Sequence, residues 1–361
     1  MKCKISLVPA ALAAVMLALT SVAQPAPTPV VQAKPKIVVL ATGGTIAGAQ
    51  ASTKEAGYKS GTFKVEDLIK AVPQLMDLAD LTGEQIVNIG SQNMNNEVWL
   101  KLAKRVNAVL TQTNVNGVVI THGTDTMEET AYFLNLVVKS DKPVVMVGSM
   151  RPATAISADG PANLYNAVAV AIHPEARGRG VLVVLNDEIH YAREIEKQNS
   201  TQLDTFKSPN RGRAGVVNTG MVHFFNKQAM PHTTAAEFSV EGVDVLPRVE
   251  IIYSYANLGR DFIDCAVEKG VKGLVLAGVG DGNTTDPALA ALGDAVNKGV
   301  VVVRSSRTGS GLVVRNVEIN DDKLGTVAAM ELNPQKARVL LMLALMKTSN
   351  PKEIQDKFLK Y

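Results

Sequence analysis

The chain has few cysteines, few histidines and almost no net charge. Of its 361 residues, 2 are cysteine and 5 are histidine, and the formal charge is +3 at pH 7. The histidines are scattered, and no Cys/His cluster has the spacing of a zinc site. So small a charge lacks the electrostatic footprint of a nucleic-acid-binding protein. We therefore expect neither a bound metal nor a nucleic-acid partner.

The N-terminus carries a short apolar run. Lys2 and Lys4 precede a mostly apolar stretch over residues 5–19, and Ser21-Val22-Ala23 resembles a small-x-small cleavage site. This order is typical of a secretory signal peptide. About 15 apolar residues are few for a membrane span, which needs about 20, although an uncleaved anchor helix is the alternative. We expect a signal peptide over 1–23, a flexible lead-in over 24–35, and a periplasmic protein without a membrane anchor.

The remaining chain has the composition of a soluble globular protein. Hydrophobic residues make up 46% and charged residues 20%, which argues against disorder, collagen and a coiled coil. Cleavage after Ala23 removes two of the 37 basic residues and leaves 35 against 34 acidic ones. It also leaves Cys265 as the single cysteine, which excludes an intrachain disulfide in any compartment.

Short apolar runs alternate with helical patterns from residue 37 onward. Most of the runs are continuous rather than alternating, as in parallel strands that are covered on both faces. The predicted strands are Ile37–Ala41, Gln85–Ile89, Val118–Thr121, Val144–Val147, Val181–Leu185, Val249–Tyr253, Leu274–Ala277 and Val300–Val303. The predicted helices between them include Val65–Leu78, Val98–Leu110, Thr126–Val138 and Pro161–Ile172.

The βαβα order predicts an α/β protein with parallel sheets and crossover helices. Asp286, Asn333 and Asn350 each precede a proline and are expected to cap a helix. The stretch over 210–247 interrupts the rhythm with Gly, Pro and Thr. We therefore expect a three-layer N-terminal domain over 36–245 and a smaller parallel α/β C-terminal domain over 246–361.

Polar residues follow the predicted strands at the point where each strand ends. Because ligands of open parallel sheets bind at the carboxyl ends of the strands, these residues should converge at one edge. They are Thr42–Gly48, Gly90-Ser91-Gln92, His122–Thr126, Gly148–Arg151 and Asn186-Asp187.

Two of these hydroxyls, Thr45 and Thr124, are candidate nucleophiles that need a base. His122 is one candidate, although a lone histidine at a strand end is more often a hydrogen-bonded structural residue. Lys197, in the loop after the fifth strand, is another, since burial can lower a lysine pKa. A solvated surface lysine is the simpler interpretation from composition.

The glycine-rich turns do not indicate a nucleotide cofactor. The turn at Gly43-Gly44 lacks the Gly-Lys-Ser/Thr of a P-loop, and Asn283 occupies the last glycine position of the segment 278–283. We therefore expect no cofactor.

Two long segments of the chain resemble a known family. The segments 41–48 (ATGGTIAG) and 121–129 (THGTDTMEE) are similar to the two signatures of the bacterial L-asparaginases. The likeness extends from residue 37 to residue 361 and includes 332–338 (LNPQKAR). With a signal peptide ahead of it, the chain resembles the exported type II branch.

The resemblance implies an amidohydrolase and a role for particular residues. Thr45 matches the nucleophilic threonine and Tyr58 the tyrosine that assists it, while Thr124, Asp125 and Lys197 match a hydrogen-bonded triad. The positions that match substrate-binding residues are Ser91, Gln92, Thr124, Asp125, Ser149, Asn283 and Glu318. The last two match residues that enter the site from a neighbouring subunit, which implies a homotetramer built from two dimers.

The substrate and the class of protein leave alternatives open. Ser149 matches relatives that also accept glutamine, whereas Gln92 matches the asparagine-preferring ones, so L-asparagine is expected with L-glutamine as an open side activity. An amidase acting on peptide-borne asparagine is a second alternative. Ser140 replaces a cysteine that some relatives use in a disulfide. A periplasmic amino-acid binding protein would also be exported, but it gives no reason for two strand-end threonines and Lys197.

Overall fold

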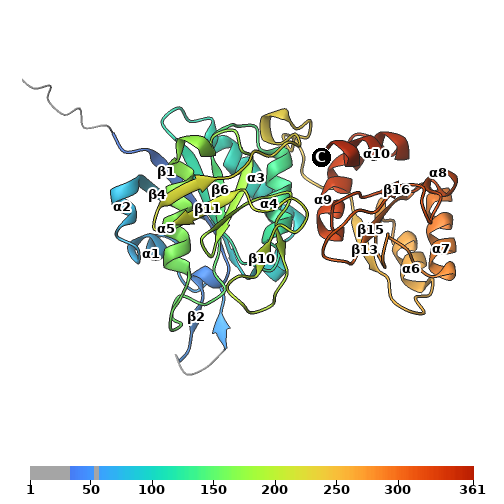
Figure 1. Ribbon diagram of the computed structural model, residues 1–361, viewed down its shortest axis with the longest axis horizontal. Coiled ribbons are helices and arrows are strands. Elements are labelled where there is room, and N and C mark those ends of the chain that lie inside the picture. The colour runs from blue at the N-terminus through green and yellow to red at the C-terminus, as the bar shows by residue number, and fades with distance from the viewer. Residues whose placement is uncertain (1–32, 53–56) are drawn as a thin grey trace, which may run out of the picture. The chain divides into compact units, whose positions relative to one another are not determined.

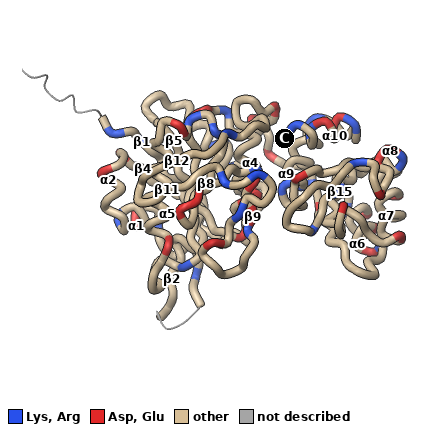
Figure 2. Tube along the Cα trace, in the orientation of Figure 1, with Lys and Arg blue, Asp and Glu red and all other residues tan. Residues whose placement is uncertain are grey.

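The computed structural model describes residues 33–52 and 57–361 (Figure 1). The signal peptide expected over 1–23 and most of the lead-in expected over 24–35 lie outside these residues. Residues 34–361 form one compact unit. No helix in the described part of the chain is long and apolar enough to cross a bilayer. Basic and acidic residues are interspersed along that part (Figure 2).

The N-terminal domain contains an eight-stranded sheet in the order β12-β11-β8-β7-β6-β5-β1-β4. Strands β1 and β4 to β7 are parallel, and β8, β11 and β12 are added antiparallel at one edge. The strands are β1 (Lys36–Gly43), β4 (Asp80–Ile89), β5 (Gly117–Thr121), β6 (Val144–Val147), β7 (Val181–Leu185), β8 (Glu188–Tyr191), β11 (Gly215–Asn218) and β12 (Met221–Phe224). All five predicted strands are present, and the three antiparallel strands were not predicted.

Helices cover both faces of this sheet. Since neighbouring residues of a strand point to opposite faces, Val39 and Leu40 of β1 belong to different apolar clusters. The Val39 face packs against α1 (Val65–Lys70), α2 (Leu75–Leu78) and α5 (Gly160–Ile172). The Leu40 face packs against α3 (Asn96–Leu110) and α4 (Met127–Val137). The predicted three-layer domain is confirmed.

The single helix predicted over Val65–Leu78 is wrong. The segment forms α1 and α2 separately, and Pro73 lies between them. A proline has no N–H for the helix ladder and disfavours helical geometry in the residue before it, so the helical pattern does not continue through it.

Two short strand pairs stand apart from the large sheet. The first pairs β2 (Ala49–Gln50) with β3 (Tyr58–Lys59), and the second pairs β9 (Glu196–Lys197) with β10 (Phe206–Lys207). Each strand has two residues, and main-chain hydrogen bonds outside the pairs also hold these segments, such as Gly61 N–H to the Gly44 carbonyl oxygen and Gln198 N–H to the Thr205 carbonyl oxygen.

The C-terminal domain has a parallel four-stranded sheet in the order β13-β14-β15-β16, which confirms the predicted class. Its strands are β13 (Val249–Tyr253), β14 (Gly273–Gly278), β15 (Val301–Ser306) and β16 (Val327–Ala328). Helices α6 (Asp261–Glu268) and α7 (Asp286–Asn297) pack on one face and α9 (Pro334–Leu345) on the other. Helices α8 (Asp321–Leu324) and α10 (Pro351–Lys360) complete the domain. The domain boundary near residue 245 stays a prediction.

Two of the three predicted helix caps are confirmed. The side chains of Asn333 and Asn350 accept main-chain N–H bonds at the starts of α9 and α10. The prediction for Asp286 is wrong, because Thr285 caps α7 and Asp286 is the first helical residue. Thr285 has the extended backbone that a cap requires, and its Oγ1 accepts from Ala288.

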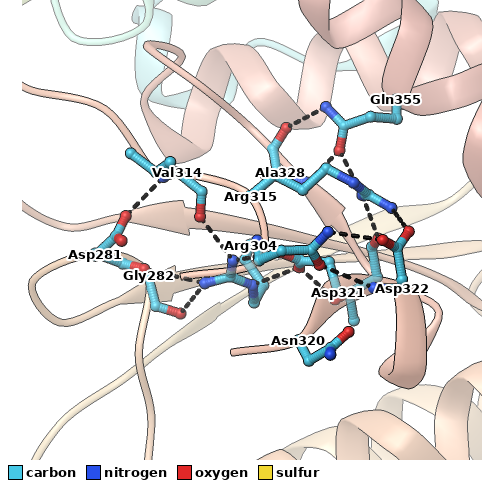
Figure 3. A network of polar contacts seen from close by, with 12 residues as sticks. Asp281, Gly282, Arg304, Val314, Arg315, Asn320, Asp321, Asp322, Ala328 and Gln355 are labelled. Atoms are coloured by element: carbon cyan, nitrogen blue, oxygen red, sulfur yellow. Dashed lines mark hydrogen bonds and ion pairs between the residues drawn. The ribbon is translucent and has the colours of Figure 1, made fainter. Parts of the chain in front are cut away.

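A buried ion pair connects several segments of the C-terminal domain (Figure 3). Arg304 of β15 and Asp321 of α8 have side chains that are 1% and 0% exposed, and they form two hydrogen bonds of 2.7 and 2.8 Å. The other guanidinium donors reach the carbonyl oxygens of Asp281, Gly282 and Val314. One side chain therefore joins β15, the turn over 279–283 and the loop that precedes α8.

We expect Asp321→Asn to lower the free energy of unfolding by about 3–5 kcal/mol, because it leaves the Arg304 charge buried without its partner. The matched control is Asp264→Asn, which breaks an exposed pair with Arg260 and should change stability little. Urea denaturation at pH 7 measures both. Equal losses in the two variants would contradict a special role for the buried pair.

The cost of Asp321→Asn should also depend on pH. Burial raises the pKa of the Asp321 carboxyl, but hydrogen bonds from Arg304, Thr326 and Asn316 outweigh that effect and lower it. Because the folded-state pKa lies below the unfolded one, the stabilisation is complete at neutral pH and disappears as the pH falls through the lowered value. The difference between the wild type and Asp321→Asn should therefore narrow in acid.

Candidate active site

The order of the parallel strands defines where a ligand can bind. Strand β1 lies between β4, the next parallel strand in the chain, and β5, the one after that. The direction in which strands are added therefore reverses at β1, and open parallel sheets bind ligands at such a point, here at the carboxyl ends of β1 and β5. Thr45 follows β1 and Thr124 follows β5, so the two candidate nucleophiles flank this point.

The turns that carry the two threonines touch through their glycines. Gly44 has φ +82°, and a Cβ built on it would lie 2.3 Å from the Gly123 nitrogen and 2.4 Å from the Gly123 Cα. Any side chain at position 44 would therefore push the turns apart. The Gly44 N–H donates to the carbonyl oxygen of Ile89 at 2.8 Å, which also ties the first turn to the end of β4.

Thr45 is paired with a tyrosine hydroxyl. Its side chain is buried in a short 3₁₀ turn over Thr45–Ala47, and its Oγ1 lies 2.8 Å from Tyr58 Oη. Tyr58 belongs to β3, which pairs with β2 immediately after that turn. The predicted nucleophile thus has a second ionisable hydroxyl within hydrogen-bond distance.

Lys197 bridges a hydroxyl and a carboxylate. Its Nζ donates to Thr124 Oγ1 at 2.9 Å and to Asp125 Oδ1 at 2.6 Å. The Lys197 side chain is 16% exposed, whereas the Asp125 side chain is 57% exposed. Asp125 therefore offers a carboxylate surface to a ligand while Lys197 stays behind it. The structure excludes the solvated-lysine interpretation.

The end of β4 brings Ser91 against the same turn. The Asp125 N–H donates to Ser91 Oγ at 3.1 Å, and Thr126 Oγ1 donates to the Ser91 carbonyl oxygen at 2.8 Å. A Cβ on Gly123 would lie 2.5 Å from Ser91 Oγ, so this contact also requires a glycine. Gln92 follows Ser91 and is exposed.

Ser149 lies at the end of β6, and its hydroxyl is already used within the turn. Its Oγ donates to the Arg151 carbonyl oxygen at 2.7 Å. Asp159 accepts the N–H groups of Met150 and Arg151, each at 2.9 Å, and so fixes the turn. Ser149 as a whole is fully buried, so its hydroxyl serves the turn.

Asn283 and Glu318 form a pair in the C-terminal domain. The Asn283 amide donates to Glu318 Oε2, and the Glu318 side chain is exposed. Over 33–52 and 57–361, no hydrogen bond or ion pair connects either residue with the site residues of the N-terminal domain. The predicted residues thus fall into one N-terminal cluster and one separate pair.

His122 does not join the cluster. It is fully buried, and burial lowers its pKa to about 4. Its Nδ1 lies 2.7 Å from the Gly123 carbonyl oxygen, which can only accept, so Nδ1 carries the proton of the neutral ring. His122 is therefore a buried hydrogen-bonded residue that supports the Gly123 turn.

One residue of the site was not predicted. Glu128 lies in the first turn of α4, and its Oε2 accepts from the main-chain N–H of Lys197 at 3.1 Å. The available signal was the position of this carboxylate at a predicted helix start, three residues after Asp125. Its partner in β9 could not be recognised from that spacing.

Comparison with known proteins agrees with this arrangement. The family model described as "Asparaginase, N-terminal" matches residues 36–230, and "Glutaminase/Asparaginase C-terminal domain" matches residues 248–358. The chain belongs to the asparaginase family.

Individual members of the asparaginase family are similar along most of this chain. "L-asparaginase 2" of Bacillus subtilis is 56% identical over 91% of this chain and 87% of its own. "Probable L-asparaginase periplasmic" of Haemophilus influenzae is 52% identical, covering 90% and 92%. The crystal structure of the probable cytoplasmic L-asparaginase of Campylobacter jejuni has a TM-score of 0.89 and 52% identity, covering 91% of this chain and 100% of its own.

We expect Gly44→Ala to lower kcat at least about 100-fold, because displacing reacting groups by about 1 Å costs that much. Gly178→Ala is the matched control, since Gly178 has a similar φ of +71° and a built Cβ there would have no atom of the described residues within 4 Å. Both variants bear the backbone cost of a positive φ, but only the first separates the threonine turns. Steady-state kinetics and melting temperatures measure the difference. Equal effects would contradict a requirement for close contact.

Proposed function

We propose that this chain hydrolyses the side-chain amide of free L-asparagine to L-aspartate and ammonia. The observation that carries the proposal is the hydrogen bonding of the two strand-end threonines, Thr45 with Tyr58 and Thr124 with Lys197. A threonine hydroxyl needs such partners to lose its proton and act as a nucleophile.

The reaction runs in two steps. Thr45 Oγ1 attacks the amide carbon and passes its proton to Tyr58 Oη, which at the same time passes its own hydroxyl proton on toward the substrate nitrogen. The tetrahedral intermediate breaks its C–N bond, and a proton passed to the nitrogen lets ammonia leave an acyl-enzyme. Thr124, polarised by Lys197, assists the attack of Thr45 on the amide carbon. In the second step, water cleaves the ester of the acyl-enzyme and returns a proton to Thr45. Main-chain N–H groups of the glycine turns stabilise the oxyanion, at about 3 kcal/mol each.

The substrate is held by its charged ends. Asp125 presents an exposed carboxylate to the α-ammonium group, and Ser91 with Gln92 binds the α-carboxylate. The Ser149 carbonyl oxygen receives the amide nitrogen. Asn283 and Glu318 act in the site of a neighbouring subunit of a homotetramer, which accounts for the lack of a hydrogen bond or ion pair between them and the cluster of their own chain in the described structure. An active monomer would contradict this shared site.

The proposal extends to location and to a second substrate. The basic and apolar N-terminus supports export to the periplasm. A family model that names both glutaminase and asparaginase supports a side activity on L-glutamine. The two substrates differ by one methylene, which a pocket distinguishes by about 1–3 kcal/mol.

We expect the purified protein to release one ammonia per L-aspartate formed from L-asparagine, more slowly from L-glutamine, and hardly at all from a blocked, peptide-like asparagine. Thr45→Val and Thr124→Val should each lower kcat by several orders of magnitude. Thr113→Val, at an exposed position, is the matched control. Binding of asparagine without release of ammonia would indicate a binding protein instead. Normal turnover in either threonine variant would exclude that threonine from the mechanism.

A further inference from the structure

A buried carboxylate lies directly behind Lys197. The Glu128 side chain is 5% exposed, and its two oxygens have different partners. Oε2 accepts the main-chain N–H of Lys197 at 3.1 Å, and Oε1 accepts from Gln335 Nε2 at 2.8 Å. Gln335 belongs to the first turn of α9. A single carboxylate therefore joins α4 and β9 of the N-terminal domain to α9 of the C-terminal domain.

The same helix holds β9 at a second point. Lys336, next to Gln335, is 1% exposed, and its Nζ donates to the carbonyl oxygen of Ile195, two residues before Lys197. Strand β9 has only two residues and, among the described strands, pairs with β10 alone. Such a short pair holds a lysine weakly by itself, so the bonds from Glu128 and Lys336 supply the missing constraint.

The charges of Glu128, Glu196 and Lys336 affect one another. Burial raises the pKa of both Glu128 and Glu196, and the nearby Lys336 ammonium opposes the rise in each. Burial in turn lowers the pKa of Lys336, which the two carboxylates oppose. An ionised acceptor makes a hydrogen bond about twice as strong as a neutral one. Lys336 therefore strengthens the bond that Glu128 makes with the Lys197 main chain.

We propose that Glu128, held by Gln335 of α9, is a positioning residue that, together with the bond from Lys336 to Ile195, keeps Lys197 within reach of Thr124 and Asp125. The inference rests on the role proposed above for Lys197. It gives the C-terminal domain a function inside its own chain, because α9 fixes the lysine that polarises the second threonine.

The neighbouring Glu129 provides a matched control. It also lies in the first turn of α4 and faces α9, with its carboxylate 3.9 Å from Arg338. Burial raises its pKa to about 7. Nothing in the described structure bonds Glu129 to β9, so it shares the environment of Glu128 without the contact to Lys197.

The test compares Glu128→Met, Glu128→Gln and Glu129→Met in the full chain, with L-asparagine as the substrate. Glu128→Met should lower kcat about 100-fold with KM within about twofold, because a displaced lysine affects the chemical step more than substrate binding. Glu128→Gln should recover most of the rate, since its amide oxygen can still accept the Lys197 N–H. Glu129→Met should turn over like the wild type at a similar melting temperature.

A double-mutant cycle separates positioning from general structural damage. If Glu128 acts through Lys197, adding Glu128→Met to Lys197→Met should lower kcat no further. Additive losses would overturn the proposal, as would equal kcat values in Glu128→Met and Glu129→Met. Should Glu128→Met fail to fold, Gln335→Leu removes only the bond from α9 and should lower kcat several-fold; an unchanged rate would overturn the role of α9.

The single variant Lys197→Met also separates a failure of this inference from a failure of the proposed function. A slow Lys197→Met beside a fast Glu128→Met would overturn the positioning role alone. Normal turnover in Lys197→Met would overturn the proposed role of Lys197 and the inference that rests on it.

Discussion

The site depends on the close approach of two main-chain turns, at Gly44 after β1 and at Gly123 after β5. The parallel pairing of β1 with β5 brings these strand ends side by side. Only glycine permits the remaining contact, because a Cβ on Gly44 would overlap the Gly123 backbone. The following residues, Thr45 and Thr124, are carried by these turns. Their relative position is therefore a property of the sheet and not of flexible side chains.

Electrostatic interactions around Lys197 also hold the site together. Lys197 comes from β9, outside the large sheet, and its ammonium lies between a buried hydroxyl and a largely exposed carboxylate. A largely buried lysine requires compensation, and here Asp125 supplies it while its carboxylate stays largely exposed on the other side. The Glu128 bond to the lysine main chain and the Lys336 bond to Ile195 extend this arrangement into the C-terminal domain.

The sequence predicted those elements of the fold that have a recognisable pattern within their own residues. The buried parallel strands were recognisable because both of their faces are apolar, as in β6 and β7. Strand β12 was not, since its residues alternate between exposed and partly buried positions and make no continuous apolar run. The break at Pro73 was visible in the sequence, but the apolar period on either side of it favoured one helix.

The residues of the site also differed in how far they could be predicted from the sequence. Strand-end positions indicated Thr45 and Thr124 directly, whereas the importance of Lys197 came from resemblance, because a loop lysine has no intrinsic mark. The partners of Glu128 could not be foreseen, since Lys197 and Gln335 lie 69 and 207 residues away along the chain. Tertiary contacts of that kind leave no periodic signal in a single sequence.

A crystal structure with bound L-aspartate tests the central claim most directly. The account predicts that the ligand's side-chain carboxylate lies within hydrogen-bond distance of both Thr45 Oγ1 and Thr124 Oγ1, with its ammonium group against Asp125. Aspartate bound elsewhere, or at this edge with either threonine hydroxyl beyond reach of its side-chain carboxylate, would contradict it.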